Sequence, residues 1–388
     1  MITILAWSAA IAAALPSVTL AGELVAGLAR GRATRLHLPP RPPIAILVPA
    51  HDEATTIART LLLIRQQLHA GDRLIVIADN CTDDTAEVAR RAGAEVIERF
   101  APERGKAYAL AYGREAIRAA PPAVVLLIDA DCVPAPHAIA ALAASVRAQD
   151  AVVQARYLLE CGIDASPLVR ISTFAFLIKN FIRQRGLQRL CGTALLQGSG
   201  MGFPWRIFEH APLQSASLVE DLELGLELAL LGHRIRFEPR ARFVSNASSR
   251  RATTSQRRRW EHGTLGIAAT FVPRLVAAGL AGRPGLLLLA ADLTVPPLAL
   301  FVIVQSGIAA LLVLAAGSIG ASGPAWLQLT AFALAILALA TSWAGFGRLL
   351  VPMRTLPGIA AYIVWKLPIY GGYLLRRQRQ WVRTDRAP

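Results

Sequence analysis

The chain has 388 residues, 54% of them hydrophobic, and 41 Lys and Arg against 26 Asp and Glu give a net charge of +15. This composition is too apolar for an ordinary soluble enzyme and too charged in the middle of the chain for a pure bundle of membrane helices. The length allows one sizeable globular domain together with membrane segments.

Residues 1–29 are predicted to form an N-terminal transmembrane anchor. Ile2–Leu28 is nearly uncharged apart from Glu23 and exceeds the roughly 20 residues that cross a bilayer. Four arginines follow directly: Arg30, Arg32, Arg35 and Arg41. Positive charge marks the cytoplasmic flank, so we expect the next domain in the cytoplasm. A cleaved signal peptide is the alternative, which is disfavoured because no basic segment precedes the apolar one.

Residues 41–263 are predicted to form an α/β domain. Short runs rich in Val and Ile are typical of buried strands and occur at 44–50, 73–79, 94–99, 123–129 and 151–159. Helical patterns separate them at 54–68, 83–93, 105–120 and 134–149. Strands alternating with helices predict a mostly parallel sheet that is covered on both faces. Ligands bind such sheets beyond the carboxyl ends of the strands, so the functional residues are expected there.

The first two predicted strands end in polar motifs. PAHDE, residues 49–53, is not followed by G-x-G-x-x-G, which disfavours a dinucleotide site. The second strand ends in ADNCTDDT, residues 78–85. Here Asp79 lies where its carboxylate could accept hydrogen bonds from a nucleobase or a ribose. Asp83 and Asp84 fit the capping of the following helix better.

Two pairs of acidic residues are the strongest candidates for chemistry. LLIDADCVP places Asp129 and Asp131 at the end of a strand, where side chains two residues apart point the same way. Two hard oxygen ligands with open positions suit Mg²⁺ or Mn²⁺ bound to a diphosphate. Further on, Glu220 and Asp221 begin an amphipathic pattern, where stabilisation of the helix dipole is the alternative explanation. The glycine-rich stretch 198–205 precedes them and could wall a sugar pocket.

The four cysteines form no C-x-x-C pair, so neither a zinc site nor a disulfide framework is indicated, and we expect reduced thiols: Cys81, Cys132, Cys161 and Cys191.

Residues 264–388 are predicted to hold interface helices and two further spans. The spans are expected at 286–316 and 325–347, although Asp292 and two prolines interrupt the first. That interruption predicts either a carboxylate facing a cavity or an earlier helix end. The stretch 356–375 could lie at the interface or form a fourth span.

Two stretches before these spans mix apolar with basic residues. The segments 166–190 and 255–278 do so at helical spacing, which is typical of helices that lie on a membrane surface. They would seat the active site at the bilayer surface.

The ordered set VPAHDE, ADNCTDDT, RGKA, DAD, VED and QRRRW resembles the family 2 glycosyltransferases with a GT-A fold. More closely, the chain is similar to their membrane-embedded branch, which includes cellulose, hyaluronan and chitin synthases and ceramide glucosyltransferases. The resemblance covers residues 44 to about 263. Valine stands in VED where many members have threonine, which weakens the match at the acceptor site.

The resemblance implies a role for each matching residue. Asp221 would be the general base, and Asp131 together with Asp129 would hold Mg²⁺ or Mn²⁺ at the donor diphosphate, Asp131 being the better ligand. The other residues expected at the nucleotide sugar are Glu53, Asp79, Lys106 and Arg259. The residues expected at the acceptor are Glu220, Gln256 and Trp260, the last stacking on a sugar face. Gln256, Arg259 and Trp260 make up the Q-x-x-R-W motif.

These features together predict an inverting glycosyltransferase in the inner (plasma) membrane, multi-pass, with its catalytic domain in the cytoplasm. It would move a sugar from a nucleotide diphosphate sugar, by family precedent a UDP-sugar, to a lipid or glycan acceptor in exopolysaccharide or cell-envelope synthesis. Transfer of a single sugar to a lipid and a noncatalytic membrane scaffold stay open as alternatives. Three spans are few for a polysaccharide channel, so an oligomer or an export partner could complete it. No nucleic acid is expected, because the positive charge clusters at membrane flanks.

Overall fold

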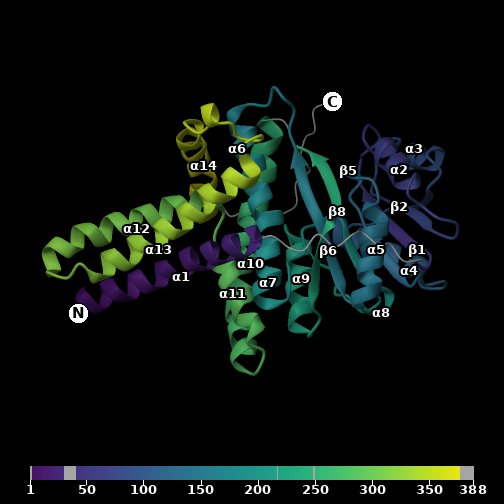
Figure 1. The fold of residues 1–388 in the computed structure, drawn as a ribbon. Coiled ribbons are helices and arrows are strands. Elements are labelled where there is room, and N and C mark those ends of the chain that lie inside the picture. Colours follow the sequence, from purple (N-terminus) through teal and green to yellow (C-terminus); the bar gives the residue numbers. More distant parts are fainter. Residues whose placement is uncertain (1, 30–40, 216, 248–249, 376–388) are drawn as a thin grey trace. The chain divides into compact units, whose positions relative to one another are not determined.

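The computed structural model describes residues 2–29, 41–215, 217–247 and 250–375. The chain divides into two compact units, each assembled from separated stretches of sequence (Figure 1). Among the described residues, the sheet unit comprises 41–161 and 193–259, with gaps at 216 and 248–249, and the helical unit comprises 2–29, 162–192 and 260–375. The predicted basic flank at Arg30, Arg32 and Arg35 lies outside the described residues.

The sheet unit is built on one mixed sheet, which in the described part of the chain has the strand order β3-β2-β1-β4-β7-β6-β8-β5. Its strands are β1 Ile44–Ala50, β2 Arg73–Asp79, β3 Glu95–Arg99, β4 Val124–Leu127, β5 Cys132–Pro134, β6 Val152–Glu160, β7 Met201–Pro204 and β8 Ile235–Asn246. The first four in spatial order are parallel, as predicted, whereas β7 runs antiparallel to β4 and to β6. The strands β5, β7 and β8 were not predicted from the sequence, and the sheet is less parallel than expected.

Helices of the sheet unit follow the predicted alternation. They are α2 Ile57–Arg65, α3 Thr85–Arg91, α4 Lys106–Ile117, α5 Ala138–Gln149, α8 Trp205–Phe208 and α9 Glu220–Leu230. The central strands β1 and β4 are almost entirely buried because their apolar side chains are covered on both faces. Glu53, Asp129 and Asp131 therefore fall in the loops that follow these strands.

The direction of β7 decides which loops meet at one edge of the sheet. Leu127 of β4 pairs with Met201 of β7 in antiparallel register. The residues that follow β4 consequently lie beside the residues that precede β7. This brings the acidic stretch after Leu127 next to the glycine-rich stretch before Met201.

The two aspartates of the D-x-D motif do not lie in a strand, so the prediction that strand geometry orients them was wrong. β4 ends at Leu127, and Asp129 and Asp131 lie in a turn whose backbone closes through a 3.0 Å hydrogen bond from Cys132 N to Asp129 O. Their orientation therefore comes from the turn and its neighbours rather than from the alternation of side chains along a strand.

The helical unit contains the segments that were predicted as anchor, interface helix and C-terminal region. Its elements are α1 Ile2–Leu28, α6 Pro167–Leu177, η1 Ile178–Arg183, α7 Gln184–Cys191, α11 Gly285–Thr294, α12 Leu298–Ile319, α13 Gly323–Ser342, η2 Trp343–Gly347, η3 Met353–Thr355 and α14 Gly358–Leu375. α10, Arg250–Leu280, starts in the sheet unit and continues into the helical unit at Trp260. α1 packs along α12 and α13 (Figure 1). The segment 162–192 groups with these helices rather than with the sheet.

Four helices among the described residues are long and apolar enough to cross a membrane: Ile2–Leu28, Gln256–Leu280, Leu298–Gly317 and Gly323–Gly347. The beginning of the span expected at 286–316 was wrong, because the helix is interrupted between α11 and α12 and the candidate span starts at Leu298. Val295 is extended, and the two prolines after it cannot donate backbone hydrogen bonds and disfavour helix before them. The stretch 255–278 had been placed on the membrane surface, yet its helix has the length and composition of a span.

A buried ion-pair triad ties three helices of this unit together. Arg183 of η1 donates from Nε to Glu23 of α1 at 2.7 Å and from Nη2 to Asp292 of α11 at 2.6 Å. All three side chains are buried. Asp292 thus lies near the end of α11, which agrees with the earlier helix end that was one of the two alternatives. Its carboxylate is paired with Arg183.

The crossing of α1 with η1 and α7 needs glycine on both sides. A Cβ atom at Gly27 would lie 2.1 Å from the carbonyl oxygen of Ile182, and one at Gly186 would lie 1.9 Å from that of Glu23. The obstructing atoms are backbone, which cannot swing away. The two helices therefore touch backbone to backbone.

We expect Gly27→Ala to destabilise the helical unit, because the new methyl group forces α1 away from η1. Overpacking of this kind costs roughly 1–3 kcal/mol. Gly22→Ala, in the same helix, is the matched control, since nothing lies within 4 Å of its added Cβ. Thermal unfolding of the purified chain in detergent measures both variants. Equal unfolding temperatures for the two would contradict the crossing.

Candidate functional site

Lys106 is the centre of a charged cluster at the carboxyl edge of the sheet. Its Nζ contacts Oδ1 of Asp129 and donates a 2.6 Å hydrogen bond to the carbonyl oxygen of Gly198. A Cβ atom on Gly198 would lie 3.2 Å from Oδ2 of Asp221 and 3.8 Å from Oδ2 of Asp129. The structure therefore brings Lys106, Asp129 and Asp221, all predicted site residues, around one glycine.

The loop that carries Gly198 is held by a glutamine that the sequence reading missed. Gln154 of β6 is fully buried, accepts from the Gln197 backbone N–H at 2.9 Å and donates to the Ser199 carbonyl at 2.9 Å. Ser199 Oγ in turn accepts from the backbone N–H of Asp129 at 3.0 Å. Gly198 has φ +93°, which disfavours any residue with a side chain. One amide thus fixes the loop between Asp129 and Asp221.

Glu220 and Asp221 begin α9 as predicted, with both side chains half-buried. Burial, and then the charge of Asp221, raise the pKa of Glu220 to about 7, although Lys106 and Arg259 act in the opposite direction. Burial lowers the pKa of Lys106, but the carboxylates of Asp129 and Glu220 outweigh it and the net shift is upward. Near neutral pH the site therefore holds a charged lysine beside a glutamic acid that still takes up a proton.

The two aspartates of the D-x-D turn could hold a divalent cation. Asp129 is 26% exposed and Asp131 is half-buried, so both can be reached from solvent. Two hard carboxylates fit Mg²⁺ or Mn²⁺ when the remaining ligands come from phosphate and water. Because Lys106 contacts Asp129, Asp131 is the better candidate for direct coordination.

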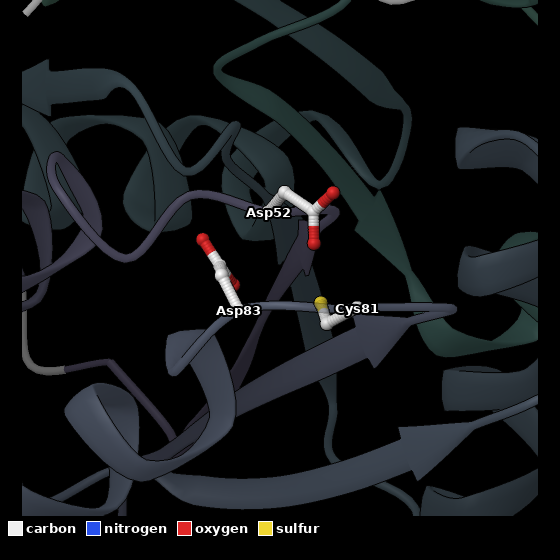
Figure 2. Close-up of side chains that lie close together, drawn as sticks. All are labelled: Asp52, Cys81 and Asp83. Atoms are coloured by element: carbon white, nitrogen blue, oxygen red, sulfur yellow. The ribbon is translucent and has the colours of Figure 1, made fainter.

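A second acidic group lies after β1 and β2, where Asp52, Cys81 and Asp83 bring their ligand atoms within 4.8 Å of one another (Figure 2). In the described ranges it is the one cluster of at least three His, Cys, Asp or Glu residues whose ligand atoms lie close enough to share a metal ion. Each carboxylate already serves the opposite loop: Asp52 accepts from Thr82 N at 2.6 Å, and Asp83 accepts from Ala54 N at 3.1 Å. Burial raises the pKa of the Cys81 thiol, which disfavours the thiolate that binds metals. The cluster is therefore best explained as a latch between two loops.

Two predicted nucleotide contacts lie at the same edge of the sheet. Asp79 ends β2, is 5% exposed and accepts at 2.5 Å from Nη1 of Arg99, which ends β3. Glu53 follows β1 and accepts from Thr56 Oγ1 at 2.7 Å. Arg99 was missed because its pairing joins two strands whose register the sequence does not reveal. The roles of Asp79 and Glu53 toward a nucleotide stay predictions.

The Q-x-x-R-W residues lie on one helix, α10, and their spacing of three and four places them on one face. Arg259 lies close enough to lower the pKa of Glu220 by its charge. Trp260 belongs to the helical unit, where its ring centroid is 5.7 Å from that of Phe176. Gln256 is half-buried. Their roles toward an acceptor stay predictions.

Comparison with known proteins identifies related sequences. A sequence model described as glycosyltransferase-like family 2 matches residues 40–263. The probable glycosyltransferase YdaM of Bacillus subtilis (strain 168) is 25% identical over 248 residues, which are 60% of this chain and 57% of the relative. The matched region thus spans little more than half of that protein.

One solved structure of the same fold matches nearly the whole chain. The mannosyltransferase PcManGT from Pyrobaculum calidifontis, in complex with GDP-Man and Mn²⁺, matches with a TM-score of 0.57 at 20% identity, over 96% of this chain and all of its own. Glucosyl-3-phosphoglycerate synthase from Mycobacterium tuberculosis, in complex with Mn²⁺ and UDP-Glc, matches 53% of this chain and 69% of its own, with a TM-score of 0.36 at 22% identity. The first likeness supports the GT-A fold, and no argument rests on the second.

The raised pKa of Glu220 predicts a pH-dependent stability. Between pH 4.5 and about 7 the folded chain holds the Glu220 proton more tightly than the unfolded chain. The stabilisation is therefore complete at the acid end of this window and is lost as the pH rises through it. Glu220→Gln removes this titration, so its unfolding temperature should gain on that of the wild type as the pH rises. Parallel unfolding curves for the two across the window would contradict the assignment.

Proposed function

Because the chain belongs to glycosyltransferase-like family 2, we propose that it transfers a sugar from a nucleotide diphosphate sugar to a membrane-associated acceptor, with inversion at the sugar carbon. The observation that carries the proposal is the meeting of Asp129, Lys106 and Asp221 around Gly198. A donor diphosphate and a base must be neighbours for such a transfer. At one edge of the sheet, Asp221 would supply the base, and Lys106 and Asp129 would supply charged groups for binding the diphosphate.

Asp221 is the proposed general base. Inversion in a single displacement requires that the acceptor hydroxyl loses its proton as it attacks, and a carboxylate within hydrogen-bond reach of that hydroxyl can take it. Burial and the neighbouring charge of Asp221 raise the pKa of Glu220 to about 7. Glu220 itself is proposed to bind the acceptor.

The leaving diphosphate carries negative charge that must be neutralised. Asp131, with Asp129, would hold Mg²⁺ or Mn²⁺, and the cation would supply that neutralisation when bound. Lys106 and Arg259 are proposed to add positive charge on the protein side, each lowering the barrier by about 3 kcal/mol by analogy with other charge-stabilising donors. Asp79 and Glu53 are proposed to bind the nucleotide.

The apolar helices support a reaction at a membrane. Among the described residues, four helices have the length and composition of spans, and basic residues follow the first of them in sequence. By the positive-inside rule the sheet unit would be cytoplasmic and the protein would reside in the inner (plasma) membrane. The acceptor, contacted by Gln256 and Trp260, would be a growing exopolysaccharide or envelope glycan. An oligomer or an export partner would complete a path for such a polymer.

Turnover of nucleotide sugars tests the proposal directly. The purified chain in lipid is incubated with UDP-glucose, UDP-N-acetylglucosamine or GDP-mannose and either Mg²⁺ or Mn²⁺, and nucleotide release and product masses are followed. GDP-mannose is included because the structurally similar mannosyltransferase holds it. A ladder of masses indicates a polymer, and one added hexose indicates single transfer to a lipid. Absence of turnover with every donor would favour a noncatalytic scaffold.

Asp221→Asn should lower the transfer rate by about 10²–10⁴-fold, because the amide cannot take the acceptor proton. Asp164→Asn, an exposed carboxylate in the helical unit, is the matched control and should leave the rate unchanged. Retained transfer in Asp221→Asn would remove this residue from the mechanism.

Gly198→Ala tests the geometry between the carboxylates. The methyl group would lie 3.2 Å from Asp221 Oδ2 and displace it. Gly232→Ala is the control, because its φ of +94° matches the +93° of Gly198 while its surroundings are open. Both should lose roughly 1–2 kcal/mol of stability from backbone strain. Only Gly198→Ala should lose transfer, by on the order of 100-fold. Equal transfer rates would refute the arrangement.

A further inference from the structure

α14 contains a lysine that is completely buried among apolar side chains. Lys366 has no exposed surface, and its ammonium contacts Oε1 of Glu261 on α10. The rings of Tyr362 and Trp365 lie 5.5 and 5.2 Å from the Lys366 nitrogen. Burying an ammonium and a carboxylate is costly, and an apolar pair of similar volume is often at least as stable. Stability alone therefore does not explain this pair.

A second residue of α10 is held by the same face of α14. The Nε2 atom of His262 lies 2.8 Å from the carbonyl oxygen of Ile369, and His262 is fully buried. Since a carbonyl only accepts, Nε2 carries the hydrogen. The His262 ring also meets Tyr373 edge-on, with centroids 5.3 Å apart. Lys366, Ile369 and Tyr373 follow at spacings of three and four, which defines one face of the helix.

The turn of α10 held in this way begins with the tryptophan of the Q-x-x-R-W motif. Trp260 immediately precedes Glu261 and His262, and its own ring packs on Phe176 of α6. α6 and α14 share a hydrophobic cluster that includes Ile171 and Tyr362. Side chains from two mutually packed helices therefore fix three consecutive residues of α10.

We propose that Lys366 is a positioning residue, which with Glu261 fixes the turn of α10 that presents Trp260 to the acceptor. The inference rests on the proposed function for the role of Trp260. The contacts described above come from α6 and α14 and reach Trp260, Glu261 and His262, whereas Arg259 belongs to the sheet unit. Loss of the pair should consequently impair use of the acceptor and leave use of the donor intact.

The test compares Lys366→Met with the double variant Glu261→Gln/Lys366→Met and with the charge swap Glu261→Lys/Lys366→Glu. Lys179→Met, at an exposed lysine of η1, is the matched control. The probes are UDP-glucose and GDP-mannose as donors and octyl glucoside and octyl mannoside as acceptors. The measured quantities are KM and kcat for each substrate, donor hydrolysis without acceptor, and hydrogen exchange of the backbone at residues 256–265.

We expect Lys366→Met to lower kcat/KM for the acceptor by roughly 10- to 100-fold, with donor KM and donor hydrolysis unchanged. The double variant leaves no unpaired charge, so it should regain thermal stability but keep the acceptor defect. The charge swap should recover acceptor use at least in part. A double variant with wild-type acceptor kinetics would show that the pair is merely structural and would overturn the proposal, as would an equal loss of donor use.

Hydrogen exchange separates this inference from the proposed function. Faster exchange at 256–265 in Lys366→Met and in the double variant, but not in Lys179→Met, supports the positioning of the turn even without a transfer assay. Unchanged exchange in both would overturn it. A wild type that turns over no donor would instead contradict the proposed function and leave the exchange result standing.

Discussion

The candidate site depends on one ammonium group placed among carboxylates. Asp129, Glu220 and Asp221 approach each other at the end of a buried sheet, where three negative charges without compensation would repel one another strongly. The Lys106 ammonium contacts one of them, and the fields of the others raise its pKa. Its second contact, to the Gly198 carbonyl, fixes the loop between the D-x-D turn and α9. Removal of this charge would separate the acidic groups that the proposed chemistry needs together.

The motifs predicted which residues would gather but not how. Asp129, Asp131 and Asp221 could be found because each stands at a local boundary that composition reveals, namely the end of an apolar run or the start of a helix. The approach of Asp129 to Asp221 depends on β7 pairing antiparallel with β4, which is a long-range contact within the sheet. β7 is four residues long and contains glycine and proline, so its sequence resembles a loop. For the same reason Gln154 could not be recognised as the clamp of the loop before β7.

In the helical unit, too, features that depend on local sequence were predicted and long-range contacts were not. Length and hydropathy identified the N-terminal span and the span near 325–347, because these properties are local. The pairing of buried charges was not predictable. Glu23 and Asp292 are far apart in sequence and meet only through Arg183, which lies in a segment that was expected on the membrane surface. At least one basic residue of the segment 166–190 therefore points inward, because the Arg183 guanidinium is buried against Glu23 and Asp292.

Ion pairs that are wholly or partly shielded from solvent define positions in both units, because they tolerate little displacement. An apolar contact keeps most of its energy when two helices slide by an ångström, whereas a buried charge that loses its partner is strongly destabilised. The pairs Lys106–Asp129 and Lys366–Glu261 each hold an element beside a residue of the proposed reaction. The loop of Gly198 and the turn of Trp260 are short polar stretches that hydrophobic packing alone would leave loosely placed. Ionic contacts at such points specify geometry at the expense of stability, which is a reasonable exchange where a reaction requires fixed distances.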